Sequence, residues 1–284
     1  MSDLLTVQNL NKQYKTFALQ GVSFALPRGT MMGLIGPNGA GKTTTIKALL
    51  GMVRPDGGEL TVLGRPADDP ATREDLGVVM DLPFYVDAWT CEGVEAALRP
   101  FYRRWDGERY AALLNQFGID RKKKVKELSR GMKVKLMLAA ALAHRPRLLL
   151  LDEPTSGLDP VAREELLDLL AAFLQDEGNG VLYSTHITAD LEKAADSITF
   201  LLDGRVVYTG GKDELIDRYR VVKGGPDEVP SDPHLLLGLR RHSTGFEAIT
   251  DSANLGRLPR SLLVERASLE ELIVFLNREG SHHA

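Results

Sequence analysis

Four residues in the stretch IGPNGAGKTT, at 35 to 44, have the types and spacing of a phosphate-binding loop. Gly36 and Gly41 are separated by four residues, and Lys42 and Thr43 follow directly. Glycines let the backbone N–H groups point inward at the β- and γ-phosphates, Lys42 adds a mobile positive charge, and the Thr43 hydroxyl can bind Mg²⁺. An apolar strand pattern precedes the loop and a helical pattern follows it, as this motif requires. The alternative, a simple glycine-rich turn before a helix, fits this context less well. The loop residues expected to contact the nucleotide are Gly36, Pro37, Asn38, Gly39, Ala40, Gly41, Lys42, Thr43 and Thr44.

Acidic residues follow a second apolar strand pattern, LLLLD at 148 to 152. Asp152 and Glu153 stand at the carboxyl end of a predicted parallel strand, where ligands bind in open α/β sheets. We expect Asp152 to hold Mg²⁺, directly or through water, and Glu153 to polarise the attacking water as general base. His186 directly follows the strand pattern VLYST and could reach the γ-phosphate from the neighbouring strand end. An acidic pair is also a common loop start, but the phosphate loop upstream favours catalysis.

A second candidate anion site lies in LSRGMKVKLML, at 128 to 138. Ser129, Arg130 and Gly131 stand at the head of an apolar helical pattern. A helix start gathers unpaired backbone N–H groups and the positive end of the helix dipole, so it is suited to an anion. Because the chain already has a phosphate loop, it remains to be explained which phosphate this second site would bind.

The elements that must position these residues alternate between strands and helices. Strand patterns at 4–10, 22–26 and 30–36 precede a helix pattern that ends at Gly51, and patterns at 59–64 and 76–80 predict a further strand pair. SITFLLDGRVVYTG predicts a hairpin that turns on Asp203 and Gly204. This alternation predicts an α/β core with a mainly parallel sheet. Residues about 84–130 interrupt it with a helical pattern, which indicates an all-helical insert.

The character of the chain changes beyond about residue 221. KGGPDEVPSDP, at 223 to 233, suits a linker or a long loop. SLEELIVFL, at 268 to 276, combines a Ser-to-Glu capping box with an apolar helix face that must pack on something, most simply on its own small domain. We therefore expect one domain over 1–221 and a small C-terminal α+β accessory domain over 222–284.

Composition is that of a soluble globular chain, with 43% hydrophobic and 26% charged residues among 284. The longest apolar stretch, at 136 to 143, is far shorter than the roughly 20 residues that cross a bilayer. The N-terminus lacks the pattern of a signal peptide, and Cys91 stands alone, so we expect a cytoplasmic protein. A net charge of −4 gives no overall attraction for nucleic acid, and the run RKKKVK is better interpreted as a solvated loop.

In their order and spacing, IGPNGAGKTT, LSRGMKVKL, LLLLDEPTSGLDP and STH resemble the nucleotide-binding subunit of an ATP-binding cassette (ABC) transporter. The resemblance covers residues 4 to about 220 and implies a P-loop NTPase core with an antiparallel β subdomain. In that family the serine motif completes the ATP site of the opposite subunit, so Ser129 and Gly131 would serve the ATP of a second ATPase subunit. Tyr14 would stack on adenine. The contact between subunits would be lined by Ser156, Gly157, Leu158 and Asp159.

Two departures from the family pattern stand out. The usual signature is LSGGQ, whereas this chain has Arg130 in place of a glycine and Met132 in place of glutamine. The form LSRGMK is similar to that of ABC-2 type exporter ATPases of bacteria, which pair with separate permease chains. Asp81 stands where the family's Q-loop glutamine is expected, and it becomes a candidate metal contact. Because aspartate is shorter and charged, we expect Asp81→Gln to preserve ATP binding but to change hydrolysis or its stimulation by the partner.

The function that these observations favour is an ATPase that works as a dimer and drives a separate transmembrane permease. We expect it to bind no nucleic acid, and the contacts with the transported substrate would lie in the permease chain. It would be an exporter subunit, peripheral on the inner face of the cell membrane. The apolar segment 82–89 is favoured as a docking surface, and the alternative is that it folds under the helical insert. A cytosolic ABC ATPase in a regulatory, ribosomal or DNA-related role is the alternative function.

Overall fold

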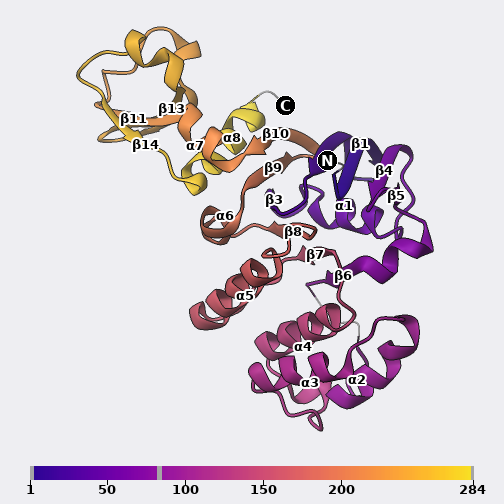
Figure 1. Cartoon of the computed structure of the whole chain (residues 1–284). Coiled ribbons are helices and arrows are strands. Elements are labelled where there is room, and N and C mark those ends of the chain that lie inside the picture. Colours follow the sequence, from indigo (N-terminus) through magenta and orange to yellow (C-terminus); the bar gives the residue numbers. More distant parts are fainter. Residues whose placement is uncertain (1–2, 82–84, 283–284) are drawn as a thin grey trace.

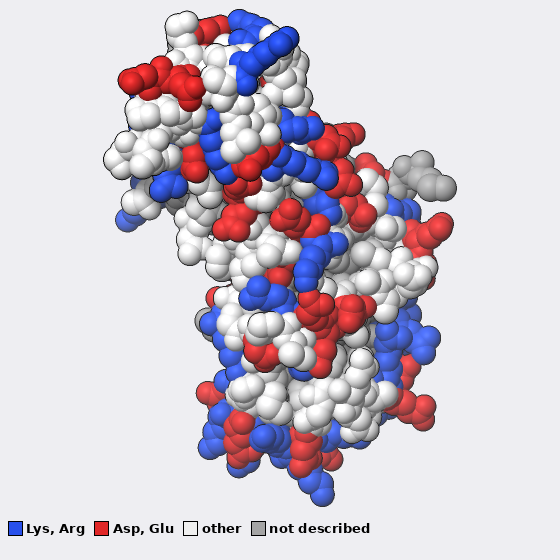
Figure 2. Space-filling view, turned by 90° about the vertical axis from the view of Figure 1, so that its left-hand side faces the viewer, with Lys and Arg blue, Asp and Glu red and all other residues white. Residues whose placement is uncertain are grey.

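The computed structural model describes residues 3–81 and 85–282. Three parts follow one another in Figure 1, with a central α/β core, a helical part at the lower end and a small C-terminal sheet at the upper end. On the face in Figure 2, basic and acidic side chains are intermingled over all three parts. None of the described helices combines the length and the apolar character needed to cross a bilayer.

The central sheet has six strands in the order β10-β9-β3-β8-β7-β6. Its strands are β3 (Met31–Ile35), β6 (Leu76–Val79), β7 (Leu148–Asp152), β8 (Gly180–Thr185), β9 (Ser197–Leu202) and β10 (Arg205–Gly211). All neighbouring strands run parallel except β9 and β10, which form an antiparallel hairpin. Asp203 and Gly204 have φ values of 47° and 76° at its turn, the left-handed backbone that a two-residue hairpin loop needs. The predicted parallel core and hairpin are confirmed.

A second, antiparallel sheet has the order β2-β1-β4-β5. It comprises β1 (Leu5–Gln13), β2 (Ala18–Leu26), β4 (Gly57–Val62) and β5 (Arg65–Pro66). The prediction that the patterns at 59–64 and 76–80 pair with each other is wrong. Strand β4 pairs with β1, whereas β6 forms the edge of the central sheet beside β7. Apolar alternation marks each segment as a strand but carries no information about which neighbour it pairs with.

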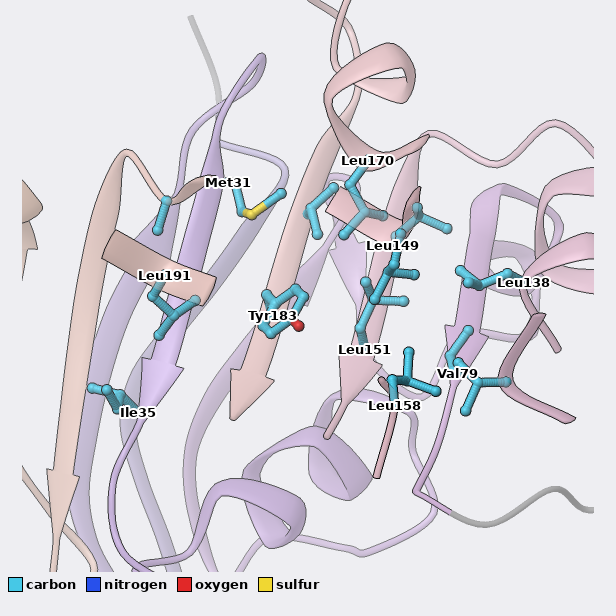
Figure 3. Packing of buried hydrophobic residues seen from close by; sticks show 14 of the residues in the cluster. Met31, Ile35, Val79, Leu138, Leu149, Leu151, Leu158, Leu170, Tyr183 and Leu191 are labelled. Carbon is cyan, nitrogen blue, oxygen red and sulfur yellow. The ribbon is translucent and has the colours of Figure 1, made fainter. Parts of the chain in front are cut away.

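Both faces of the central sheet are covered, as an unbroken apolar strand such as β7 requires. Met32 and Leu34 pack towards α1 (Lys42–Leu49) and the antiparallel sheet. Met31 and Ile35 point to the opposite face, which α5 (Pro160–Phe173) and α6 (Thr188–Ala194) cover (Figure 3). Asp159 caps α5 by accepting from the N–H groups of residues 161 and 162, as its sequence pattern predicts. The core thereby fixes the carboxyl ends of β3, β7 and β8 at one edge.

The helical part contains α2 (Cys91–Leu98), α3 (Gly107–Gln116) and α4 (Arg130–Ala143). Thr90, Asp106 and Ser129 each cap one of these helices by accepting a backbone N–H three residues on. Helix α4 packs on α3 and also contacts β6. The helical part therefore continues beyond residue 130 to the end of α4, and α4 links it to the central sheet.

The C-terminal sheet is antiparallel, in the order β12-β13-β11-β14. After α7 (Lys212–Arg218) it comprises β11 (Tyr219–Gly224), β12 (Leu237–His242), β13 (Gly245–Asp251) and β14 (Leu263–Arg266), and α8 (Leu269–His282) follows. The expected domain boundary between 221 and 222 thus falls inside β11. The segment 223–233 runs from the end of β11 into a long loop within this sheet, and so it is not a linker between domains.

Helix α8 begins with the expected capping box. The Ser268 N–H donates to Glu271 Oε2 at 2.9 Å, and the Glu271 N–H donates to Ser268 Oγ at 3.2 Å. Its apolar residues Leu269, Leu272 and Leu276 are buried in the same cluster as the core, and the helix contacts β12, α6 and β9. Helix α8 therefore packs on the small sheet and on the α/β core together.

Candidate active site

The phosphate loop joins β3 to α1, and its glycines are required by space and by backbone conformation. A Cβ atom on Gly36 would lie 2.2 Å from the carbonyl oxygen of Leu201, so that no other residue fits. Gly41 has a φ of 110° and directly precedes α1. Lys42 is 5% exposed, and its Nζ donates to the Gly36 carbonyl at 2.7 Å. The loop therefore curls around the amino group of Lys42 at the start of a helix.

Thr43 and Asp152, two residues expected to hold the metal ion, lie in direct contact. The Thr43 hydroxyl donates to Asp152 Oδ2 at 2.7 Å, and the Ser184 hydroxyl donates to Oδ1 at 2.9 Å. Burial raises the pKa of the Asp152 carboxyl, and these two hydrogen bonds offset part of that rise. Ser184, at the end of β8, is a site residue that sequence reasoning missed, because a serine within VLYST has no distinguishing spacing.

The oxygens of Thr43 and Asp152 suit a hard cation such as Mg²⁺. Among the described residues, no three or more His, Cys, Asp or Glu side chains come together as a metal-binding group. A cation held here would take its other ligands from phosphate and water, which is the usual coordination of Mg²⁺ beside a nucleotide. The residues present therefore fit the expected ion.

Glu153 and His186 form a close pair at the ends of β7 and β8. His186 Nδ1 lies 2.7 Å from Glu153 Oε2, and the Thr185 hydroxyl donates to the same oxygen at 3.3 Å. The Glu153 backbone has a φ of 51°, an unusual value for a non-glycine residue, and its N–H donates to the Ser184 carbonyl at 2.8 Å. Such left-handed residues cost about 1–3 kcal/mol and are enriched at functional sites. The arrangement aims a carboxylate with an orienting imidazole at the phosphate loop.

A buried polar network supports the loop that carries Glu153. The Thr155 hydroxyl donates to Asp190 Oδ2 at 2.6 Å, and the Tyr183 hydroxyl lies 3.0 Å from Thr155 Oγ1 and 3.2 Å from Asp190 Oδ2. Arg163 approaches Asp190 Oδ1 at 3.6 Å. Burial, and next the nearby Asp190 charge, raise the pKa of Tyr183, so the phenol stays a donor. Sequence reasoning missed this network, because its members come from four separate segments.

A cavity of about 520 Å³ lies between the phosphate loop and these acidic residues. Tyr14, expected to stack on adenine, is 40% exposed with the Lys12 ammonium 5.8 Å from its ring centroid, and it does not line this cavity. Phe17 lines it instead, and its role there was missed because the residue lies in a connection between two strands. The adenine contact of Tyr14 stays a prediction. The lining residues are Thr16, Phe17, Pro37, Asn38, Gly39, Gly41, Lys42, Thr43, Thr44, Asp81, Asp152 and Glu153.

Two loop residues that were expected to contact the nucleotide, Gly36 and Ala40, do not line the cavity and lie on the buried side of the phosphate loop. Ala40 is 2% exposed and packs with the core, while its carbonyl accepts the N–H of Gly204 at 3.2 Å. Gly36 packs against the end of β9, as its close approach to Leu201 shows. These two residues therefore shape the loop from its buried side.

The residues of the serine motif lie outside this cavity. The Ser129 hydroxyl accepts the N–H of Met132 at 3.2 Å and caps α4. Gly131 lies close to Leu158, since a Cβ there would be 3.2 Å from Leu158 Cδ2. Neither Ser129 nor Gly131 lines the cavity beside Lys42. The structure thus separates the two predicted anion sites.

Asp81 lines the cavity but is also paired with a residue of the serine motif. Arg130 donates to Asp81 Oδ1 at 2.7 Å and to Ser156 Oγ at 3.2 Å. The two departures from the family pattern are therefore in direct contact. In the segment 82–89, residues 82–84 lie outside the described residues, Val86 and Trp89 are exposed, and Tyr85 is partly buried against the core.

Comparison with known proteins identifies the family. Residues 19–156 match the family model described as ABC transporter. A lantibiotic transport ATP-binding protein of Streptococcus pyogenes is 34% identical over 207 residues, which cover 72% of this chain and 89% of that protein. The chain belongs to the ABC transporter family. The expected family and the P-loop NTPase core are confirmed by these similarities.

Other ABC transporter proteins are similar to this chain in sequence to about the same degree. A Nod factor export ATP-binding protein of Mesorhizobium japonicum is 35% identical over 91% of this chain and 81% of that protein. An uncharacterised ABC transporter ATP-binding protein of Nostoc sp. is 35% identical over 71% of this chain, but the match spans only 62% of that protein. The chain thus spans less than two thirds of the length of the first curated relatives it matches.

Solved structures of ABC transporter subunits share the fold. An ATP-binding subunit of an ABC transporter has a TM-score of 0.69 and 34% identity, covering 75% of this chain and 91% of that one. A dimeric ATP-binding cassette in a post-hydrolysis state, bound to ADP and Pi, has a TM-score of 0.66 and 25% identity, covering 73% and 98%.

Proposed function

We propose that this chain is the ATP-binding and ATP-hydrolysing subunit of an ABC exporter and drives a separate transmembrane permease. The observation that carries the chemistry is the meeting of Lys42, Asp152 and Glu153 on one cavity, with the His186 imidazole beside Glu153. These side chains come from the ends of two adjacent strands, β7 and β8, and from the start of α1, so one bound triphosphate can contact them together.

Each side chain has a distinct task towards ATP. The backbone N–H groups of the phosphate loop and Lys42 bind the phosphates. Thr43 and Asp152 hold Mg²⁺, which neutralises charge on the phosphate oxygens when it is bound. Glu153 orients a water at the γ-phosphate and accepts its proton, while His186 holds the Glu153 carboxylate in place.

Dimer formation is part of the proposal. Ser129 and Gly131 lie outside the cavity of their own chain, at the start of a helix whose N–H groups suit phosphate. We assign them to the ATP of a second ATPase subunit, either a copy of this chain or a related half. The loop 156–159, beside Arg130 and Gly131, would lie at the contact.

The assignment as an exporter rests on similarity to named relatives. The proposed docking of a permease rests on one exposed segment. Relatives named for lantibiotic transport and Nod factor export support an exporter. The exposed side chains of Val86 and Trp89 are suited to docking a permease at the inner face of the cell membrane. Purification from gently solubilised native membranes, with mass spectrometry of the co-purifying chains, tests this. A stoichiometric polytopic protein supports the exporter, whereas recovery only with ribosomes or nucleic-acid proteins favours the cytosolic alternative.

The substitution Glu153→Gln tests the assignment of the general base. We expect the variant to bind ATP but to hydrolyse it at least about 100-fold more slowly, since general-base catalysis contributes roughly 10²–10⁴-fold. It should also accumulate a closed dimer with ATP, measured by size-exclusion chromatography with light scattering. Glu164→Gln, which removes a surface carboxylate on α5 that pairs with Lys193 on α6, is the matched control and should keep wild-type turnover. Full activity of Glu153→Gln would refute the assignment.

A further inference from the structure

Arg130 connects three segments that are distant in sequence. It is the first residue of α4, and its guanidinium donates to Asp81, which follows β6, and to Ser156, which follows β7. The same side chain lies over Gly157, where a Cβ would be 3.0 Å from Arg130 Cδ. One side chain thus links the start of α4 to the rim of the phosphate cavity and to the loop after Glu153.

The pair with Asp81 adds little to overall stability, because both side chains are about half exposed and exposed ion pairs contribute weakly. Its geometry is more informative. The guanidinium directs the Asp81 carboxylate towards α4, at 2.7 Å, while Asp81 also lines the phosphate cavity. The charge of Asp81 is therefore balanced by Arg130 at a place where a triphosphate would otherwise meet an uncompensated negative charge.

We propose that Arg130 and Asp81 form a positioning pair, which holds the start of α4 and the Ser156–Gly157 turn against the rim of the phosphate cavity. Asp81 then serves as the anchor of Arg130 and is not a ligand of the metal ion. The helical part and the phosphate site move together while the pair is intact. The inference rests on the proposed ATP site only in that the cavity is where ATP binds.

A double-mutant cycle separates an anchor from a metal ligand. The variants are Asp81→Asn, Arg130→Gln and the double substitution, with Arg145→Gln as control because Arg145 forms a similar exposed pair, with Asp106, within the helical part. We expect each single substitution to lower kcat/KM for ATP by a similar factor, about three- to ten-fold, and the double to lower it no further. The half-saturating Mg²⁺ concentration should stay within about two-fold of wild type in all four variants.

Two results would overturn the proposal. Independent effects that multiply in the double variant would show that Asp81 and Arg130 do not act as a pair. A half-saturating Mg²⁺ concentration at least about ten-fold higher in Asp81→Asn, but not in Arg130→Gln, would make Asp81 a metal ligand.

A second measurement needs no nucleotide and so does not depend on the proposed function. Amide hydrogen exchange at residues 130–134 and 156–158 reports local opening. We expect Asp81→Asn and Arg130→Gln to speed exchange in both segments by at least about three-fold, and Arg145→Gln to leave both unchanged. Unchanged exchange in the two paired variants would contradict the anchor. Lack of ATP hydrolysis by the wild type would instead contradict the proposed function.

Discussion

Asp190 offers a direct test of how the site is supported, because it is 2% exposed and holds three side chains at once. Its Oδ2 accepts hydrogen bonds from Thr155 at 2.6 Å and from Tyr183 at 3.2 Å, and its Oδ1 lies 3.6 Å from Arg163. Asp190→Ala removes the acceptor of both buried hydroxyls and the counter-charge of Arg163. Thr155 and Tyr183 then have only each other, at 3.0 Å.

The expected loss of stability in Asp190→Ala follows from the groups that this substitution leaves without a partner. Removing one member of a buried ion pair costs about 3–5 kcal/mol, and the lower end applies because the Arg163 side chain is 30% exposed and can reach solvent. We therefore expect Asp190→Ala to lower the free energy of unfolding by about 3 kcal/mol. Tyr183→Phe removes one neutral donor and leaves Asp190 with its other partners, so it should cost only about 1 kcal/mol.

Urea denaturation at neutral pH measures both values, and ATP turnover of the folded proteins is the second readout. Since Thr155 lies two residues after Glu153, we expect Asp190→Ala to lower turnover more than Tyr183→Phe does. Asp190→Asn keeps an acceptor of similar shape and should be intermediate in stability. A loss for Asp190→Ala no larger than that for Tyr183→Phe would refute the argument that the carboxylate organises this network.

Two further predictions concern other buried positions. His144 is 1% exposed and stacks on Tyr102, with ring centroids 4.0 Å apart, and burial lowers its pKa below 6.5. The unfolded chain therefore takes up the proton first, so stability is full above about pH 6.5 and falls at lower pH by up to about 1.4 kcal/mol per unit. In urea titrations, the free energy of unfolding should fall less between pH 7.5 and pH 5.5 for His144→Phe than for the wild type. An equal fall in the two proteins would exclude His144 as the cause. Gly36→Ala places a Cβ against the Leu201 carbonyl and should cost about 1–3 kcal/mol and weaken ATP binding. Gly256→Ala is the comparison, since nothing lies within 4 Å of its Cβ position and its backbone is not left-handed; the argument from space fails if ATP affinity drops equally in both.

The sequence alone determined the features whose chemistry is local. Gly41 must adopt a φ that only glycine adopts readily, Asp203 and Gly204 suit a two-residue turn, and the Ser268 capping box involves residues three apart. The apolar run of β7 likewise needs no knowledge of its neighbours, because burial on both faces demands it. The phosphate loop, the parallel core, the hairpin and α8 could therefore be predicted from short windows of sequence.

Tertiary structure alone decided the relations between distant segments. Strands β4 and β6 have similar apolar patterns, and only packing places them in different sheets. The Asp190 network joins residues from four segments, and Asp81 meets Arg130 across 49 positions. The physical reason is that such hydrogen bonds and ion pairs depend on where the backbone brings side chains, whereas a pattern of residue types records only what each segment needs locally.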